Sequence, residues 1–186
     1  MFFNGKNSIV NMKLQIRQGV FETNSSSTHA VSICEFNSNI ALPEVVLFET
    51  NQEFGWEFED YTDMYSKANY LWLAICYKYN NLGEENELIK AKATISQYLE
   101  RIGVRAEFED LRYIKSEWYD DKYLDMRGYI DHPGDLYELV DAVLENPALL
   151  YGYLFNDNSM VSTGNDNDER EVNYADNAIF GVRKGN

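Results

Sequence analysis

The chain has 186 residues, of which 45% are hydrophobic and 15% aromatic, so its composition excludes an intrinsically disordered protein. It contains no apolar run of the roughly 18 residues that a membrane-spanning helix requires, and its two cysteines are too few for a disulfide scaffold. The formal net charge is −15. A surface this acidic repels nucleic acid and attracts basic partners.

The first half of the chain begins with strand-like sequence. Residues 12–18 and 30–36 alternate apolar and polar side chains and predict a hairpin around the polar run 22–29, which we expect to be a loop. Residues 44–49 are apolar enough for a buried strand. Residues 51–60 mix aromatic and acidic side chains, including Trp56, and fit either a short strand or a loop.

Two helices follow in the middle of the chain. Residues 61–79 and 84–102 each carry apolar side chains at helical spacing, which predicts one buried face per helix. Gly103 supplies a C-terminal stop for the second helix, and residues 104–108 predict a strand. Residues 111–130, rich in tyrosine and charge, remain ambiguous.

The C-terminal half is mixed. Its expected elements are a turn at 131–134, helices at 135–145 and 148–155, strands at 159–163 and 178–182, and a polar loop at 164–169. With no internal repeat and no visible boundary, the pattern predicts a single α+β domain spanning residues 1–186. It would combine N-terminal antiparallel strands, two to three packed helices and the mixed C-terminal half.

The beginning of the chain informs the expected compartment. Residues 1–11 are a candidate N-terminal extension, because Met12 is an alternative start, and they lack the layout of a signal peptide. We therefore expect a cytoplasmic protein without membrane contact, in which Cys34 and Cys76 are reduced, buried thiols. The sequence does not indicate an oligomeric state.

The uninterrupted polar run Glu22–His29 is the main candidate site. Hydroxyls and successive backbone N–H groups in a turn can bind phosphate, and a histidine can transfer protons near neutral pH. Residues 1–43 hold three basic and two acidic residues, so this region is close to neutral, whereas the rest of the chain is strongly acidic. The candidate catalytic residues are Glu22, Ser26 and His29, and the candidate phosphate-binding residues are Arg17, Asn24, Ser25, Ser27 and Thr28. His132 is an alternative second proton carrier. The competing interpretation is a solvated loop that only caps a neighbouring element.

Two segments resemble one family of small proteins. Residues 17–34 (RQGVFETNSSSTHAVSIC) resemble the opening, and residues 145–168 (ending in GNDND) the C-terminal signature, of proteins from phages and prophages of Gram-positive bacteria. Some anti-CRISPR proteins of similar size and acidity inhibit an RNA-guided host nuclease, at least one of them by cutting the guide RNA. The resemblance implies a phage-derived inhibitor, acting in the bacterial cytoplasm on the host nuclease complex with its guide RNA. The resemblance leaves open whether the chain is an enzyme. If it is one, a metal-independent ribonuclease is expected.

Two other functions remain open. A non-enzymatic mimic of nucleic acid would block a basic protein surface with acidic clusters, and a structural or regulatory phage protein would need neither chemistry. The clusters are Glu57, Glu59, Asp60 and Asp63; Glu107, Glu109 and Asp110; and Asp120, Asp121 and Asp125.

No metal or cofactor is expected. Residues Asn165–Glu169 carry oxygen ligands but do not match a calcium loop, so a polar turn is expected there. The cysteines and histidines lack the paired spacing of a zinc site.

Overall fold

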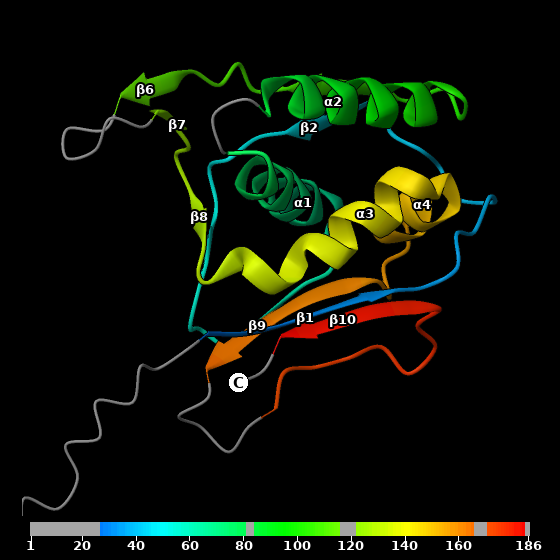
Figure 1. Ribbon diagram of the computed structural model, residues 1–186. Coiled ribbons are helices and arrows are strands. Elements are labelled where there is room, and N and C mark those ends of the chain that lie inside the picture. The colour runs from blue at the N-terminus through cyan, green and yellow to red at the C-terminus, as the bar shows by residue number, and fades with distance from the viewer. Residues whose placement is uncertain (1–26, 81–83, 116–121, 166–170, 185–186) are drawn as a thin grey trace, which may run out of the picture.

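In the computed structural model, which describes residues 27–80, 84–115, 122–165 and 171–184, a four-stranded sheet forms one side of the protein (Figure 1). Its strands are β1 (Ser27–Ile33), β4 (Glu59–Tyr61), β9 (Met160–Asn165) and β10 (Phe180–Lys184). They lie in the order β10-β1-β9-β4, and every neighbouring pair is antiparallel. The sheet therefore joins the first described strand to the last one.

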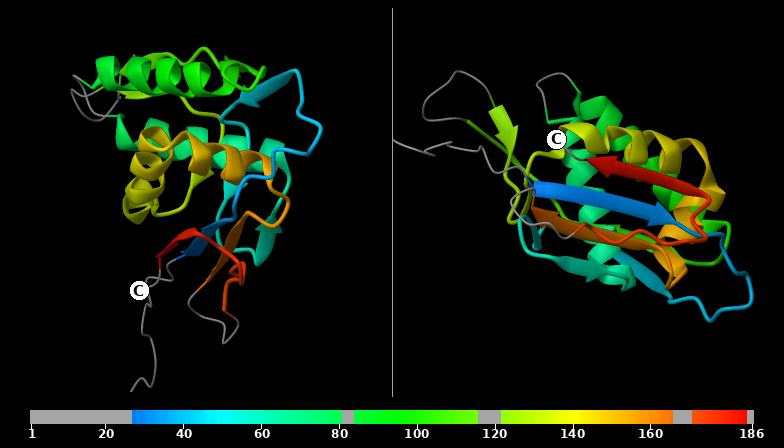
Figure 2. Two further views of the ribbon diagram at one scale, coloured as in Figure 1. Left: turned by 90° about the vertical axis from the view of Figure 1, so that its right-hand side faces the viewer. Right: turned by 90° about the horizontal axis from the view of Figure 1, so that it is seen from below.

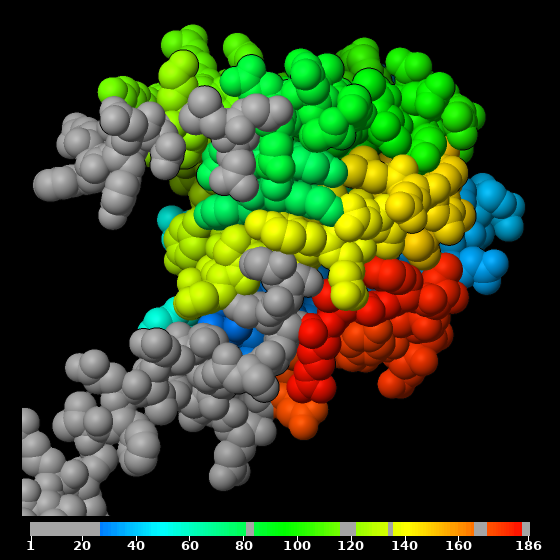
Figure 3. All heavy atoms as spheres, viewed as in Figure 1, coloured from blue at the N-terminus to red at the C-terminus, as the bar shows by residue number. Residues whose placement is uncertain are grey.

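Helix α1 lies between two layers (Figures 1 and 2). The helices are α1 (Met64–Lys78), α2 (Glu85–Glu100), α3 (Tyr137–Glu145) and α4 (Pro147–Phe155). Helices α1, α3 and α4 cover the sheet, and α2 lies on the far side of α1 beside the parallel pair of β2 (Val45–Phe48) and β5 (Arg105–Phe108). The space-filling view shows α2, α3 and β10 as one continuous surface (Figure 3).

Short strands connect the two ends of the molecule. These elements are β3 (Glu53–Phe54), β6 (Tyr113–Lys115), β7 (Lys122–Leu124), β8 (Tyr129–Ile130) and the 3₁₀ helix η1 (Pro133–Leu136). Strand β3 pairs with β8 in parallel, and β6 pairs with β7 in antiparallel fashion. Together with the four helices and the four-stranded sheet, these elements confirm an α+β fold. The ambiguous residues 111–130 contain the three strands β6, β7 and β8, and residues 116–121 are not described.

Two local predictions, the glycine stop after the second helix and the buried free cysteines, are also confirmed. Gly103 follows α2 with φ of 78°, a left-handed conformation that glycine adopts without strain. Cys34 and Cys76 are both free and buried. None of the described helices is long and apolar enough to cross a membrane.

The polar run was wrongly assigned at its C-terminal end. Ser27, Thr28 and His29 belong to β1 instead of a loop, and β1 has β10 on one side and β9 on the other. The expected hairpin between 12–18 and 30–36 is therefore wrong, because both neighbours of β1 come from the C-terminal half. Residues 12–18 themselves lie outside the described residues. The expected loop at 164–169 is likewise wrong at its start, since β9 continues through Asn165.

Helix α1 differs from its prediction in burial. Every residue from Ser66 to Cys76 is buried, so the helix has no exposed face over these three turns, whereas a single buried stripe was expected. Lys67 is tolerated inside because its Nζ donates to the carbonyl oxygens of Asn156 (2.9 Å) and Ser159 (3.2 Å). Burial lowers the pKa of Lys67 to about 8.

Candidate functional site: an acidic and aromatic pocket

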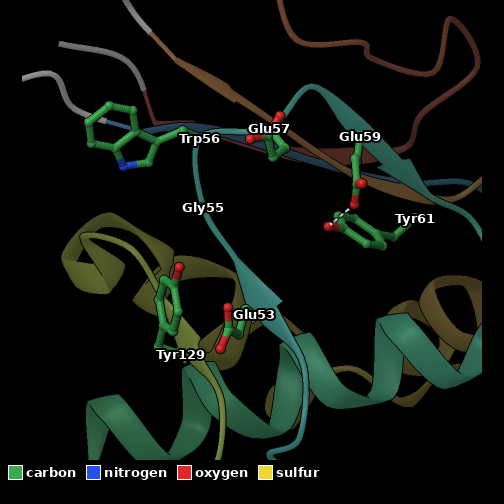
Figure 4. Close-up of a pocket in the computed structure, with 7 residues that line it drawn as sticks. All are labelled: Glu53, Gly55, Trp56, Glu57, Glu59, Tyr61 and Tyr129. Carbon is green, nitrogen blue, oxygen red and sulfur yellow. Dashed lines mark hydrogen bonds between the residues drawn. The ribbon is translucent and has the colours of Figure 1, made fainter.

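A pocket of about 510 Å³ lies beside the β4 edge of the sheet (Figure 4). It is lined by Glu53, Gly55, Trp56, Glu57, Glu59, Tyr61 and Tyr129. Three carboxylates and three aromatic rings thus surround it, and none of the lining residues is basic. We call this feature the acidic pocket.

Two strand pairings build the walls of the acidic pocket. Strand β3 places Glu53 opposite Tyr129 of β8, and β4 places Glu59 opposite Thr163 of β9. Residues two apart on a strand share a face, so Glu59 and Tyr61 both project from β4 toward the pocket (Figure 4).

The connection between β3 and β4 is held by side chains of β9. Thr163 Oγ1 donates to the carbonyl oxygen of Glu57 (2.6 Å), and Asn165 Nδ2 donates to that of Trp56 (3.2 Å). These bonds fix the backbone at Trp56 and Glu57, whose side chains are exposed. The pocket is therefore a shaped part of the fold and does not depend on a free loop.

The charged groups of the acidic pocket are mostly free to meet a ligand. The Tyr61 hydroxyl donates to Glu59 Oε2. Burial of the phenol, reinforced by Glu59, raises the pKa of Tyr61, so this hydroxyl stays a protonated donor at neutral pH. The side chains of Glu53 and Glu57 are exposed and make no hydrogen bond or ion pair with another described residue. Trp56 is 51% exposed and Tyr129 43%.

His29, the predicted proton carrier, is fully buried. The Tyr70 hydroxyl donates to its Nδ1 (3.2 Å), and its Nε2 lies 2.9 Å from Ser27 Oγ. Ser27 Oγ in turn donates to the carbonyl oxygen of Asp131 (2.9 Å), so it accepts from His29 Nε2. This order of donors fits a neutral imidazole with its hydrogen on Nε2. The ring therefore ties β1 to α1 and to the residue before His132.

The remaining residues of the predicted site are only partly placed. Thr28 lies in β1 between Ser27 and His29. Arg17, Glu22, Asn24, Ser25 and Ser26 lie outside the described residues, so their roles stay predictions. His132 is at the surface, and its Nδ1 lies 3.0 Å from Asp131 Oδ1. Because Ser27 pairs with Asn165, the described end of the polar run lies at the same end of the sheet as the acidic pocket.

The acidic clusters of the sequence are divided by the structure. Asp63 accepts from the backbone N–H of Ser66 (2.8 Å) and caps α1, and Asp60 accepts from Asn173 Nδ2 (2.5 Å). Glu109 accepts from Thr50 and from Arg127; although burial acts against it, these bonds lower the pKa of Glu109. These carboxylates have structural partners, whereas Glu53 and Glu57 have none among the described residues.

The sequence predicts only two members of the acidic pocket. The acidic cluster of the sequence marks Glu57 and Glu59 as part of a candidate surface, whereas Trp56 belongs only to a stretch that fits a short strand or a loop. Tyr61 was expected in the helix 61–79 but lies in β4. Glu53 and Tyr129 were missed because only the pairing of β3 with β8 brings them together. No local pattern in the sequence predicts the pairing of β3 with β8.

Neither a metal site nor a known relative defines the chemistry further. Within the described residues, no group of three or more His, Cys, Asp or Glu side chains gathers closely enough to hold a metal ion. No family model, curated protein or solved structure matches the chain.

Proposed function

We propose that this protein is a non-enzymatic inhibitor that uses the acidic pocket to occupy a basic, nucleic-acid-binding surface of a host protein. The observation that carries the proposal is the convergence of three carboxylates and exposed aromatic rings without any basic residue. Side chains of this kind complement the lysines and arginines that bind phosphate. The resemblance of two segments to phage proteins makes a host nuclease loaded with guide RNA the partner to test first.

Cleavage of guide RNA through Glu22–His29 stays a prediction with less support. A proton carrier must come within hydrogen-bond reach of the reacting hydroxyl, and the His29 ring is fully buried with both nitrogens in hydrogen bonds. The proposed inhibitor therefore leaves guide RNA intact.

The test measures target-DNA binding by the loaded host nuclease in the presence of the protein. The pocket variant replaces Glu53, Glu57 and Glu59 with lysine. The control variant replaces Glu44, Glu100 and Glu145, which are also exposed, with lysine. Both variants change the net charge equally, and lysine at the last residues of α2 and α3 suits the helix dipole.

We expect the wild type and the control variant to inhibit DNA binding and the pocket variant to lose inhibition. Guide RNA should stay intact in all three reactions. Inhibition retained by the pocket variant would overturn the proposal. Fragmented guide RNA in the wild-type reaction would instead support the ribonuclease.

A further inference from the structure

We propose that the acidic pocket receives the guanidinium group of an arginine side chain from the basic partner, an inference that rests on the function proposed above. The pocket offers flat aromatic surfaces together with carboxylates at several positions around one space (Figure 4). Arginine is the natural cation that uses both features at once.

The aromatic rings favour a planar cation. Trp56 and Tyr129 come from neighbouring segments and lie on the same flank of the acidic pocket in Figure 4. Trp56 makes no ring-to-ring contact within the part of the chain that the structure describes, and about half of it is exposed, so its surface is open for stacking. A guanidinium is weakly hydrated and stacks on such rings, whereas an ammonium holds its water more tightly.

The carboxylates favour a cation with several donors. Glu53 and Glu57 approach the space from β3 and from the connection to β4, and Glu59 approaches from β4 itself. Tyr61 donates to one oxygen of Glu59, which fixes that carboxylate and leaves its other oxygen for a ligand. The five N–H donors of a guanidinium can reach acceptors that are spread over different directions.

Two other cations fit the acidic pocket less well. A metal ion needs its ligands gathered around one point, and the described carboxylates do not form such a group. A quaternary ammonium needs rings on several sides, yet Tyr61 lies across the pocket from Trp56 and Tyr129 and is engaged with Glu59 (Figure 4). A stacked guanidinium that reaches toward carboxylates suits the observed one-sided arrangement.

The experiment compares two peptides of equal length and charge, one alternating arginine with glycine and the other lysine with glycine. Their affinities are measured by calorimetry for the wild type and for the variants Trp56→Leu and Tyr129→Leu. Tyr123→Leu is the matched control, because Tyr123 is equally exposed, at 43%, and does not line the acidic pocket.

The wild type and Tyr123→Leu should bind the arginine peptide about three- to tenfold more tightly than the lysine peptide. Trp56→Leu and Tyr129→Leu should reduce that preference toward unity while the affinity for the lysine peptide changes little. Equal affinity of the wild type for both peptides would overturn the inference and leave the proposed function standing. Binding of neither peptide would overturn the proposed function as well.

Discussion

At the scale of single residues, His29 distinguishes a structural role from a catalytic one. The imidazole has no exposed surface and joins Tyr70 of α1 to Ser27 of β1 by hydrogen bonds. We expect His29→Ala to lower the free energy of unfolding by about 2–5 kcal/mol, because it leaves a cavity and buried hydroxyls without their partner. Urea denaturation followed by circular dichroism measures this change.

The second histidine serves as the control for this prediction. His132 is exposed and has φ of 53°, a left-handed conformation that asparagine also tolerates. His132→Asn should therefore change stability by only about 0.5 kcal/mol or less. A His29→Ala protein as stable as wild type would contradict the structural role and return attention to catalysis.

At the scale of elements, helix α4 depends on a glycine. A Cβ atom at position 152 would lie 2.2 Å from the carbonyl oxygen of Cys34, just beyond the end of β1. Replacing a helical glycine with alanine ordinarily stabilises by about 1 kcal/mol. Gly152→Ala should instead destabilise the protein by about 1–3 kcal/mol, because backbone must move to relieve the overlap. Thermal melting, with ΔG from urea titration, reports the sign.

Gly55→Ala is the control for this prediction, because it adds the same Cβ atom at a glycine where there is room for it. A Cβ atom there would approach only Tyr129, at an ordinary distance of 3.5 Å from its hydroxyl oxygen, so stability should change little. A Gly152→Ala protein that is more stable than wild type would show that α4 does not lie against the end of β1 as described.

Periodicity predicts the helices of this fold better than its strands. The spacing of apolar residues placed α1, α2 and α3 within three residues of their observed ends, because helical contacts are local. The start of β1 was missed because Ser27, Thr28 and His29 are polar and favour turns when considered alone. All three pair with β9, and His29 also pairs with β10; these partners lie more than a hundred residues away and make the segment a strand.

The candidate site shows the same limit. The acidic cluster made Glu57 and Glu59 recognisable as part of a candidate surface, yet Tyr129 joins them only through the parallel pairing of β3 and β8. In the same way, Asp63 and Glu109 resembled recognition residues in the sequence. In the structure, Asp63 caps helix α1, and Glu109 forms an ion pair with Arg127.

At the scale of the whole molecule, the net charge of −15 raises the question of whether binding depends on a site or on acidity in general. Charges separated by more than about 10 Å are largely screened at 0.1 M salt, so a diffuse attraction and a local one respond differently to variants of equal net charge. If binding occurs at the acidic pocket, replacing Glu53, Glu57 and Glu59 should reduce affinity for a basic partner more than replacing three exposed carboxylates elsewhere.

The most direct measurement is the affinity for the arginine-containing peptide as a function of sodium chloride concentration. It is made for the wild type, the pocket variant (Glu53, Glu57 and Glu59 to lysine) and the control variant (Glu44, Glu100 and Glu145 to lysine). Wild type and control variant should bind with similar affinity and weaken steeply as salt rises, while the pocket variant shows little binding at any concentration. Equal losses of affinity in the two variants would contradict the account, because acidity alone, without the pocket, would then explain the binding.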